Sequence, residues 1–141
     1  MTRERSGIVR TAWLLAAIAL AGMVTWVATS YRADIAAARQ RIATGSRIAD
    51  TRCGPIEYAT HGEGPPILAV HGAGGGFDQG IDVAGDLASL GYRIIAVSRF
   101  GYLRTPLPED ASAEAQADAH ACLLDALGIP RVAILGVSAG A

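Results

Sequence analysis

The residues best suited to catalysis lie near the end of the chain, where Gly136-Val-Ser138-Ala-Gly140 matches the pattern G-x-S-x-G. The pattern directly follows the apolar run 131–136, which predicts a buried strand. A serine that leaves such a strand through a sharp turn has its hydroxyl exposed above the sheet edge. Glycines two positions away on either side allow the strand and the following segment to pass close together. We therefore predict that Ser138 is a nucleophile.

A glycine-rich segment, His71-Gly72-Ala73-Gly74-Gly75-Gly76, follows a second apolar run at 66–70. A hydroxyl that attacks a carbonyl creates an oxyanion, and preorganised backbone N–H groups stabilise it. A glycine-rich loop provides such donors without side chains in the way. We expect the amides of Ala73 and Ala139 to form the oxyanion hole. Gly74 replaces Ala73 if the register of the loop differs by one residue.

Composition excludes several other chemistries. All twelve basic residues are Arg, which removes lysine-based catalysis and the P-loop lysine. No G-x-G-x-x-G pattern fits residues 72–80, and a net charge of −1 provides no basic field for nucleic acid. We therefore expect no cofactor, no metal site and no nucleic-acid partner.

The two cysteines, Cys53 and Cys122, are too few for a four-ligand zinc site and do not form a C-x-x-C pair. We interpret them as two unrelated small apolar residues. A single disulfide bridge stays open as an alternative if the domain lies outside the cytoplasm.

Strand-like and helix-like runs alternate from residue 53 to residue 141. We expect strands over 56–60, 66–70, 92–97 and 131–136, and helices over 80–90 and 112–127. Gly91 and Gly128 end the two helices, and a proline-containing loop covers 98–110. This alternation is typical of an α/β domain with a parallel sheet and flanking helices.

The N-terminal part of the chain has a different character. Residues 11–31 carry no charge, and as a helix they would measure about 30 Å, which matches a bilayer core. We predict an uncleaved single-pass membrane anchor over residues 1–31, because the apolar run is longer than that of a signal peptide. Export after signal cleavage near Ser30 is the alternative. Residues 32–52 form an Arg-rich spacer, and arginines on both sides of the apolar run leave the orientation open.

Residues 53–141 resemble the N-terminal half of the α/β-hydrolase superfamily, in its serine-nucleophile branch. The motifs that carry the resemblance are Ile67-Leu-Ala-Val-His71-Gly72, Gly91-Tyr-Arg-Ile-Ile-Ala-Val97, Arg99-Phe-Gly101-Tyr, Leu124-Asp-Ala-Leu-Gly128-Ile and the turn at Ser138. The resemblance implies a mostly parallel sheet with flanking helices and an acyl-enzyme formed on Ser138. A serine at this turn argues against the dehalogenase and epoxide-hydrolase branches, which use Asp there.

The chain departs from the family pattern in two places. The loop after the fourth strand often carries an acidic residue before its Arg-Gly pair, but here Ser98 precedes Arg99, which we expect to alter the mouth of the pocket. The family order is Ser, then acid, then His, yet His61, His71 and His120 all precede Ser138. We therefore interpret the chain as a fragment that ends before its acid and its His, and we expect residues 1–141 alone to be inactive.

Three functional hypotheses follow. The first is a serine hydrolase that acts on a small acyl substrate, namely an ester, thioester, amide or activated C–C bond. The second is a non-catalytic, membrane-anchored binding module that keeps part of a hydrolase sheet. The third is an acyltransferase, which would use the same turn. Nothing in the sequence indicates an oligomeric state.

Overall fold

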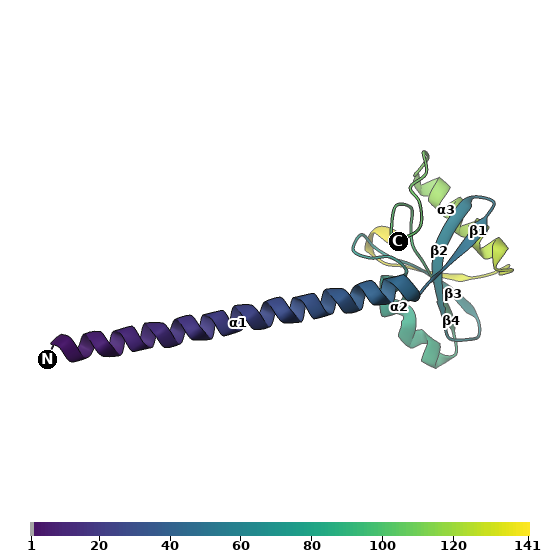
Figure 1. The fold of residues 1–141 in the computed structure, drawn as a ribbon. Coiled ribbons are helices and arrows are strands. Elements are labelled where there is room, and N and C mark those ends of the chain that lie inside the picture. The colour runs from purple at the N-terminus through teal and green to yellow at the C-terminus, as the bar shows by residue number, and fades with distance from the viewer. Residues whose placement is uncertain (1) are drawn as a thin grey trace. The chain divides into compact units, whose positions relative to one another are not determined.

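The computed structural model describes residues 2–141, which form two compact units, residues 1–40 and residues 41–141 (Figure 1). Helix α1 (Thr2–Thr44) makes up the described part of the first unit and the beginning of the second. The second unit contains the sheet and the remaining helices.

Helix α1 includes the apolar run that the sequence predicts to be helical, and its stretch Ala12–Thr44 is long and apolar enough to cross a membrane. None of the most apolar part of this stretch is buried within the protein. A signal sequence near the N-terminus can also pass this test of length and composition, so the helix fits both alternatives. The predicted spacer is helical as far as Thr44.

The second unit is built on one five-stranded sheet with the order β1-β2-β4-β3-β5. Strands β3, β4 and β5 are parallel to one another, whereas β2 pairs antiparallel with both β1 and β4. The strand bounds are Arg47–Thr51 (β1), Gly54–His61 (β2), Pro66–Val70 (β3), Arg93–Val97 (β4) and Ala133–Gly136 (β5). The predicted α/β class, with a mostly parallel sheet and flanking helices, is confirmed.

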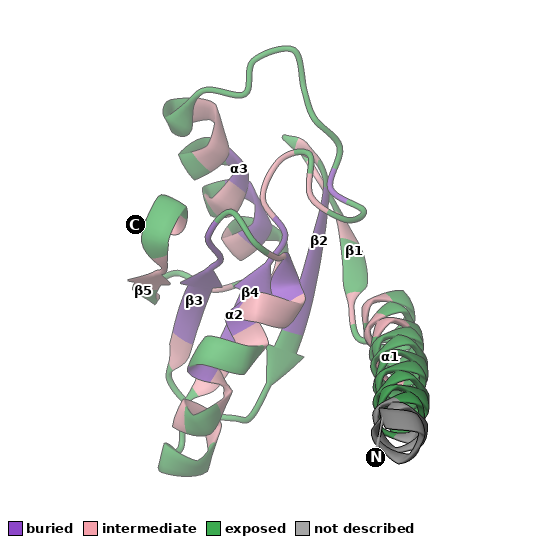
Figure 2. Cartoon of the chain, turned by 90° about the vertical axis from the view of Figure 1, so that its left-hand side faces the viewer, coloured by how far each residue is buried: buried purple, intermediate pink, exposed green. Residues whose placement is uncertain are grey.

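Helices cover both faces of this sheet. Helix α2 (Phe77–Ala84) packs on the face that presents Ile94 and Ala96, and α3 (Ala113–Ala126) packs on the face that presents Ile95 and Val97. Because side chains alternate along a strand, β4 is buried on both faces, as the purple strands between the helices in Figure 2 show. Two short 3₁₀ segments, η1 (Gly85–Leu90) and η2 (Ser138–Gly140), complete the described elements.

Two elements differ from the sequence prediction. Strand β1 lies within the range assigned to the Arg-rich spacer, so the sheet begins before residue 53. The helix predicted over 80–90 begins at Phe77, continues as η1, and ends at Gly91, whose φ of 85° is a left-handed conformation that glycine adopts readily.

The interpretation of the cysteines as unrelated residues is wrong. Cys53 and Cys122 form a disulfide with their Cα atoms 6.0 Å apart, which joins the turn between β1 and β2 to helix α3. Beside it, Arg52 pairs with Asp125 at 2.9 Å on the exposed surface. A separation of 69 residues along the chain hid this pairing from local sequence patterns.

Candidate active site

The segment that follows β5 makes a sharp turn at Ser138. The φ angle of Ser138 is 53°, a left-handed conformation that few residues other than glycine adopt. Ser138 is solvent-exposed, and the amide of Val137 still bonds to the carbonyl of Val70 at 3.0 Å, so the strand pairing continues up to the turn. A strained serine that directly follows a parallel strand has the backbone geometry expected of a nucleophile in this position.

The glycines on both sides of Ser138 are required by close backbone contacts. A Cβ added to Gly140 would lie 2.5 Å from the carbonyl oxygens of both Val70 and His71, and one added to Gly136 would lie 2.5 Å from the carbonyl oxygen of Gly140. Real Cβ atoms do not approach so closely, so the chain can fold back on itself here only with glycine at both positions. This explains the spacing of the G-x-S-x-G pattern in physical terms.

The glycine-rich loop 71–76 begins directly beside Ser138. A Cβ added to Gly72 would lie 3.2 Å from the Cβ of Ser138 and 3.0 Å from the carbonyl oxygen of Val137. The loop and the serine come from the carboxyl ends of two neighbouring parallel strands, β3 and β5, which meet at one edge of the sheet. The two segments that the sequence singled out are therefore brought together.

Side chains from the first turn of α2 hold the loop near both of its ends. Gln79 accepts a hydrogen bond from the amide of Gly72 at 2.7 Å, and Asp78 accepts one from the amide of Gly76 at 2.9 Å. Between these two points, Ala73 and Gly74 are exposed, and their amides meet no protein acceptor among the described residues. The loop thus exposes the N–H groups of Ala73 and Gly74 between two residues whose amides are held by hydrogen bonds. An oxyanion hole would need such preorganised donors.

His71 is fully buried and has a structural position in this loop. Its Nε2 accepts a hydrogen bond from the amide of Arg99 at 2.9 Å, so Nδ1 carries the proton and donates to the carbonyl of Gly72 at 2.6 Å. The ring also contacts Tyr102 edge-on, with centroids 4.7 Å apart. Burial lowers the pKa of His71, although the hydrogen bond to Gly72 opposes this effect. His71 is therefore neutral at pH 7.

Ser98, the residue that stands where the resemblance places an acid, is completely buried. Its hydroxyl donates to the carboxylate of Glu57 at 2.9 Å, a residue that is likewise completely buried. The Ser98 side chain thus points into the protein toward β2, whereas Arg99 and Phe100, which follow it, line a pocket. The expectation that this segment alters the mouth of the pocket stays a prediction.

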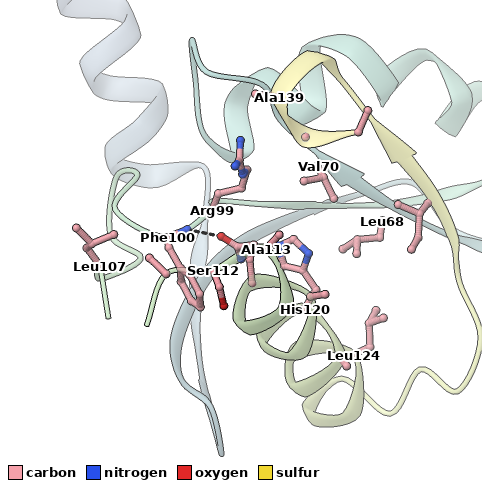
Figure 3. A pocket seen from close by; sticks show the side chains of 17 residues that line it. Leu68, Val70, Arg99, Phe100, Leu107, Ser112, Ala113, His120, Leu124 and Ala139 are labelled. Carbon is pink, nitrogen blue, oxygen red and sulfur yellow. Dashed lines mark hydrogen bonds between the residues drawn. The ribbon is translucent and has the colours of Figure 1, made fainter. Parts of the chain in front are cut away.

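A pocket of about 600 Å³ lies between α3, β3 and residues 139–141 (Figure 3). Ala139 lines it, whereas Ser138 is not among the described lining residues. Figure 3 shows His120 reaching from α3 toward the strands, and Gln116 on the same helix contacts its Nε2 at 3.0 Å. Burial, together with the charge of Arg99 and nearby His71, lowers the pKa of His120 to about 4.

Sequence reasoning identified Ser138 and the loop 71–76, but it missed the side chains that hold them. Gln79 resembled an ordinary polar helix residue, and Glu57 resembled the outward-facing position of a strand with one exposed face. Glu57 could have been found only from its pairing with Ser98, 41 residues away. Within the described residues 2–141, no three His, Cys, Asp or Glu side chains gather as a metal site would require.

Comparison with known proteins places these features in a family. A family model described as "alpha/beta hydrolase fold" matches residues 65–141. "Uncharacterized hydrolase YcgS" of Bacillus subtilis is 37% identical over 89 residues, which cover 62% of this chain and 30% of that protein.

Two solved structures resemble the fold closely. An "Alpha/beta hydrolase fold protein" from Nakamurella multipartita is 39% identical with a TM-score of 0.65, covering 67% of this chain and 33% of that one. An "Epoxide hydrolase" from an endophytic Streptomyces is 29% identical with a TM-score of 0.61, covering 69% and 31%. The chain thus spans about a third of the length of these relatives. With more than half of its residues matched by the family model, and with the strand order and turn described above, this chain belongs to the alpha/beta hydrolase fold family.

Proposed function

We propose that this chain carries the nucleophile and the oxyanion loop of a serine hydrolase. The observation that supports this most directly is the left-handed conformation of Ser138 at the carboxyl end of β5, next to Gly72 of the glycine-rich loop. In the proposed reaction, Ser138 Oγ forms a bond to the substrate carbonyl carbon and the leaving group departs with a proton. Water then releases the acyl group and regenerates the serine hydroxyl.

The oxyanion would be stabilised by the amides of Ala73 and Ala139, with Gly74 in place of Ala73 if the loop is offset by one residue. Support comes from the position of Gly72 against Ser138 and from the two side chains that hold the loop at Gly72 and Gly76. Preorganised donors of this kind typically contribute about 10²–10³ in rate for each amide.

We propose none of the histidines of this chain as the catalytic base. His71 is committed to the carbonyl of Gly72 and the amide of Arg99, and His120 is paired with Gln116. We infer that the base and the acid lie beyond residue 141 in a longer protein. Residues 1–141 alone would then show no turnover that depends on Ser138.

The proposed substrate is a small molecule with an ester, thioester, amide or activated C–C bond beside a carbonyl. One structural relative is described as an epoxide hydrolase. The serine at position 138 favours acyl chemistry, because a serine attacks a carbonyl to give an acyl-enzyme that water can hydrolyse. Transfer of the acyl group to an alcohol would proceed through the same acyl-enzyme.

We propose that residues 11–31 anchor the protein in a membrane by a single span, with cleavage near Ser30 and export as the alternative. The length and composition of Ala12–Thr44 support both. The Cys53–Cys122 disulfide supports a position of the second unit in an oxidising compartment, which both alternatives allow.

Covalent labelling tests the proposed nucleophile. A fluorophosphonate probe is added to the longest natural form of the protein, and the modified residue is mapped by mass spectrometry. We expect the label on Ser138, and no label after Ser138→Ala. Ser89→Ala is the matched control, because Ser89 is an exposed serine bonded to the carbonyl of Asp86. A folded protein that takes no label at Ser138 would instead support the non-catalytic binding module.

A further inference from the structure

Two consecutive residues at the carboxyl end of β4 hold the two ends of the glycine-rich loop. The amide of Arg99 donates to Nε2 of His71 at 2.9 Å, at the start of the loop. The hydroxyl of Ser98 accepts a hydrogen bond from the amide of Phe77 at 3.1 Å, directly after the loop ends. The position of the loop therefore depends on the side chain of Ser98 and on the backbone of Arg99.

Glu57 fixes Ser98 in both respects. The backbone carbonyl of Glu57 accepts from the amide of Ser98 at 2.9 Å, and its carboxylate Oε2 accepts from the Ser98 hydroxyl at 2.9 Å. A hydroxyl has one proton to donate, and an ionised carboxylate can only accept. With its proton directed to Glu57, the Ser98 oxygen must present a lone pair to Phe77.

The Glu57 carboxylate is ionised although it is completely buried. Burial alone raises the pKa of Glu57, but hydrogen bonds from Ser46, Arg104 and Ser98 outweigh burial and hold this pKa below its ordinary value. The bond from Ser46 Oγ measures 2.6 Å, and those from the Nε and the backbone amide of Arg104 measure 2.7 Å and 3.0 Å. A buried charge with this many partners is costly to disturb, so its geometry is well defined.

Glu57 also acts on the loop through residues 102–104. Its bonds to Arg104 draw this segment over the glycine-rich loop, where Leu103 takes a left-handed φ of 48°. A Cβ added to Gly76 would lie 2.4 Å from Leu103, and the Tyr102 hydroxyl donates to the carbonyl of Ala73 at 3.3 Å. The segment 102–104 therefore lies directly against the loop that carries the proposed oxyanion donors.

We propose that Glu57 is a positioning residue, which holds the oxyanion loop 71–76 in place through Ser98 and through the segment 102–104. The proposal rests on the proposed function for its catalytic consequence. Glu57 touches no reacting atom, so its effect would be on the geometry of the donors.

Hydrogen–deuterium exchange of the full chain in detergent tests the positioning directly, without requiring activity. The Ser98→Ala variant removes the link to Phe77 but leaves the Glu57–Arg104 ion pair in place. We expect amide exchange in residues 71–78 to rise about tenfold while α3 exchanges as before, because the Phe77 amide loses its acceptor and the Glu57 carboxylate loses one donor. Glu57→Gln should raise exchange in the same segment at least as much, and in residues 102–105 as well.

A double variant separates positioning from general destabilisation. If Glu57 acts on Phe77 through Ser98, the increase at Phe77 in the double variant should be smaller than the product of the two single increases. Glu63→Gln is the matched control, since Glu63 is an exposed carboxylate in the turn before β3. Exchange in residues 71–78 that stays at the wild-type level in Ser98→Ala, or in a Glu57→Gln variant whose α3 is intact, would overturn the proposal.

Kinetics of the longest natural form supply the second readout. We expect Ser98→Ala to lower kcat for a p-nitrophenyl ester about tenfold or more with KM within about twofold, because donors that shift act on the transition state. A tenfold rise in KM with an unchanged kcat would contradict a role in positioning the oxyanion donors. If turnover persists in Ser138→Ala, the proposed function fails, whereas the exchange experiment still decides whether Glu57 holds the loop.

Discussion

At the scale of single residues, the histidines near the candidate site are held neutral by their surroundings. His71 is buried and His120 is half-buried, each among groups that disfavour the charged ring. Both ring nitrogens of His71 are hydrogen-bonded, and Nε2 of His120 contacts Gln116. A general base needs a ring nitrogen directed at the serine and a pKa near the working pH. His71 instead bonds to Gly72 and Arg99, and His120 contacts Gln116 on the same helix.

The lowered pKa of His120 predicts a pH-dependent stability. Its ordinary value is 6.5 and its value in the folded protein is about 4. Between these values the unfolded chain binds a proton that the folded chain does not, so stability falls as the pH falls from about 6.5 to about 4. The loss from this residue should reach at most about 3 kcal/mol.

The measurement is urea unfolding of the full chain in detergent between pH 4 and pH 7, compared with His120→Gln. Glutamine keeps a polar side chain beside Gln116 but cannot take up a proton. We expect the wild type to lose stability relative to the variant as the pH falls through this window. Curves that stay parallel would show that the folded and unfolded chains protonate His120 alike.

At the scale of elements, the sequence predicts a strand or helix correctly where the pattern that forms it is local. The apolar runs before His71 and Ser138 predicted the strands β3 and β5, and β3 is buried as its continuous apolar sequence indicates. The expectation that the strand before Ser138 is buried is wrong in this structure, because β5 lies at the edge of the sheet and Ile134 is exposed. Strand β1 was missed because Arg47-Ile-Ala-Asp-Thr51 is short and largely polar, and follows a helix closely. It becomes a strand through its antiparallel pairing with β2, which no local pattern encodes.

Burial of Glu57 was unpredictable for the same reason. An alternating segment such as Ile56-Glu-Tyr58 indicates a strand with one exposed face, but residues 102–105 fold over that face and cover the carboxylate. The contacts that Ser98 and Arg99 make to the ends of the glycine-rich loop also join residues distant in sequence. The sequence could therefore single out Ser138 and the loop 71–76, which the structure brings together, but not the side chains that hold this loop.

The disulfide between the β1–β2 turn and helix α3 should contribute measurably to the stability of the fold. Replacing both cysteines by serine, Cys53→Ser with Cys122→Ser, should lower the free energy of unfolding by about 2–4 kcal/mol, because the link closes a long loop in the unfolded chain. Dithiothreitol should lower the free energy of unfolding of the wild type by a similar amount and should leave that of the double variant unchanged. Labelling of both cysteines by maleimide in the folded protein without reductant would contradict the pairing.

At the scale of the whole molecule, charge is distributed unevenly along the chain. Residues 1–52 contain eight Arg and three acidic residues, whereas residues 53–141 contain four Arg and ten acidic residues. The basic part surrounds the apolar helix, and arginines beside a span favour anionic lipid headgroups. The acidic part contains strands β2 to β5 and the candidate site. This division fits a protein with one part at a membrane and one part in water.

Membrane attachment is tested by fractionation. If residues 11–31 form an uncleaved anchor, the protein should stay in the membrane pellet after carbonate extraction and should keep its N-terminal residues in mass spectrometry. Replacing Ile18 by Arg places a charge in the middle of the span, which costs about 3 kcal/mol and should reduce the pellet fraction. A mature N-terminus near Ser30 in a soluble protein would favour the cleaved signal.

The central claim is that the Ser138 hydroxyl is the attacking group, and turnover tests it most directly. Hydrolysis of p-nitrophenyl butyrate by the longest natural form of the protein is compared in wild type, Ser138→Ala and Ser89→Ala. We expect Ser138→Ala to lower kcat by about 10⁴-fold or more with an unchanged fold, since the groups of such a site act as a unit, and Ser89→Ala to match the wild type. Ester hydrolysis in Ser138→Ala within about tenfold of the wild type would contradict the account.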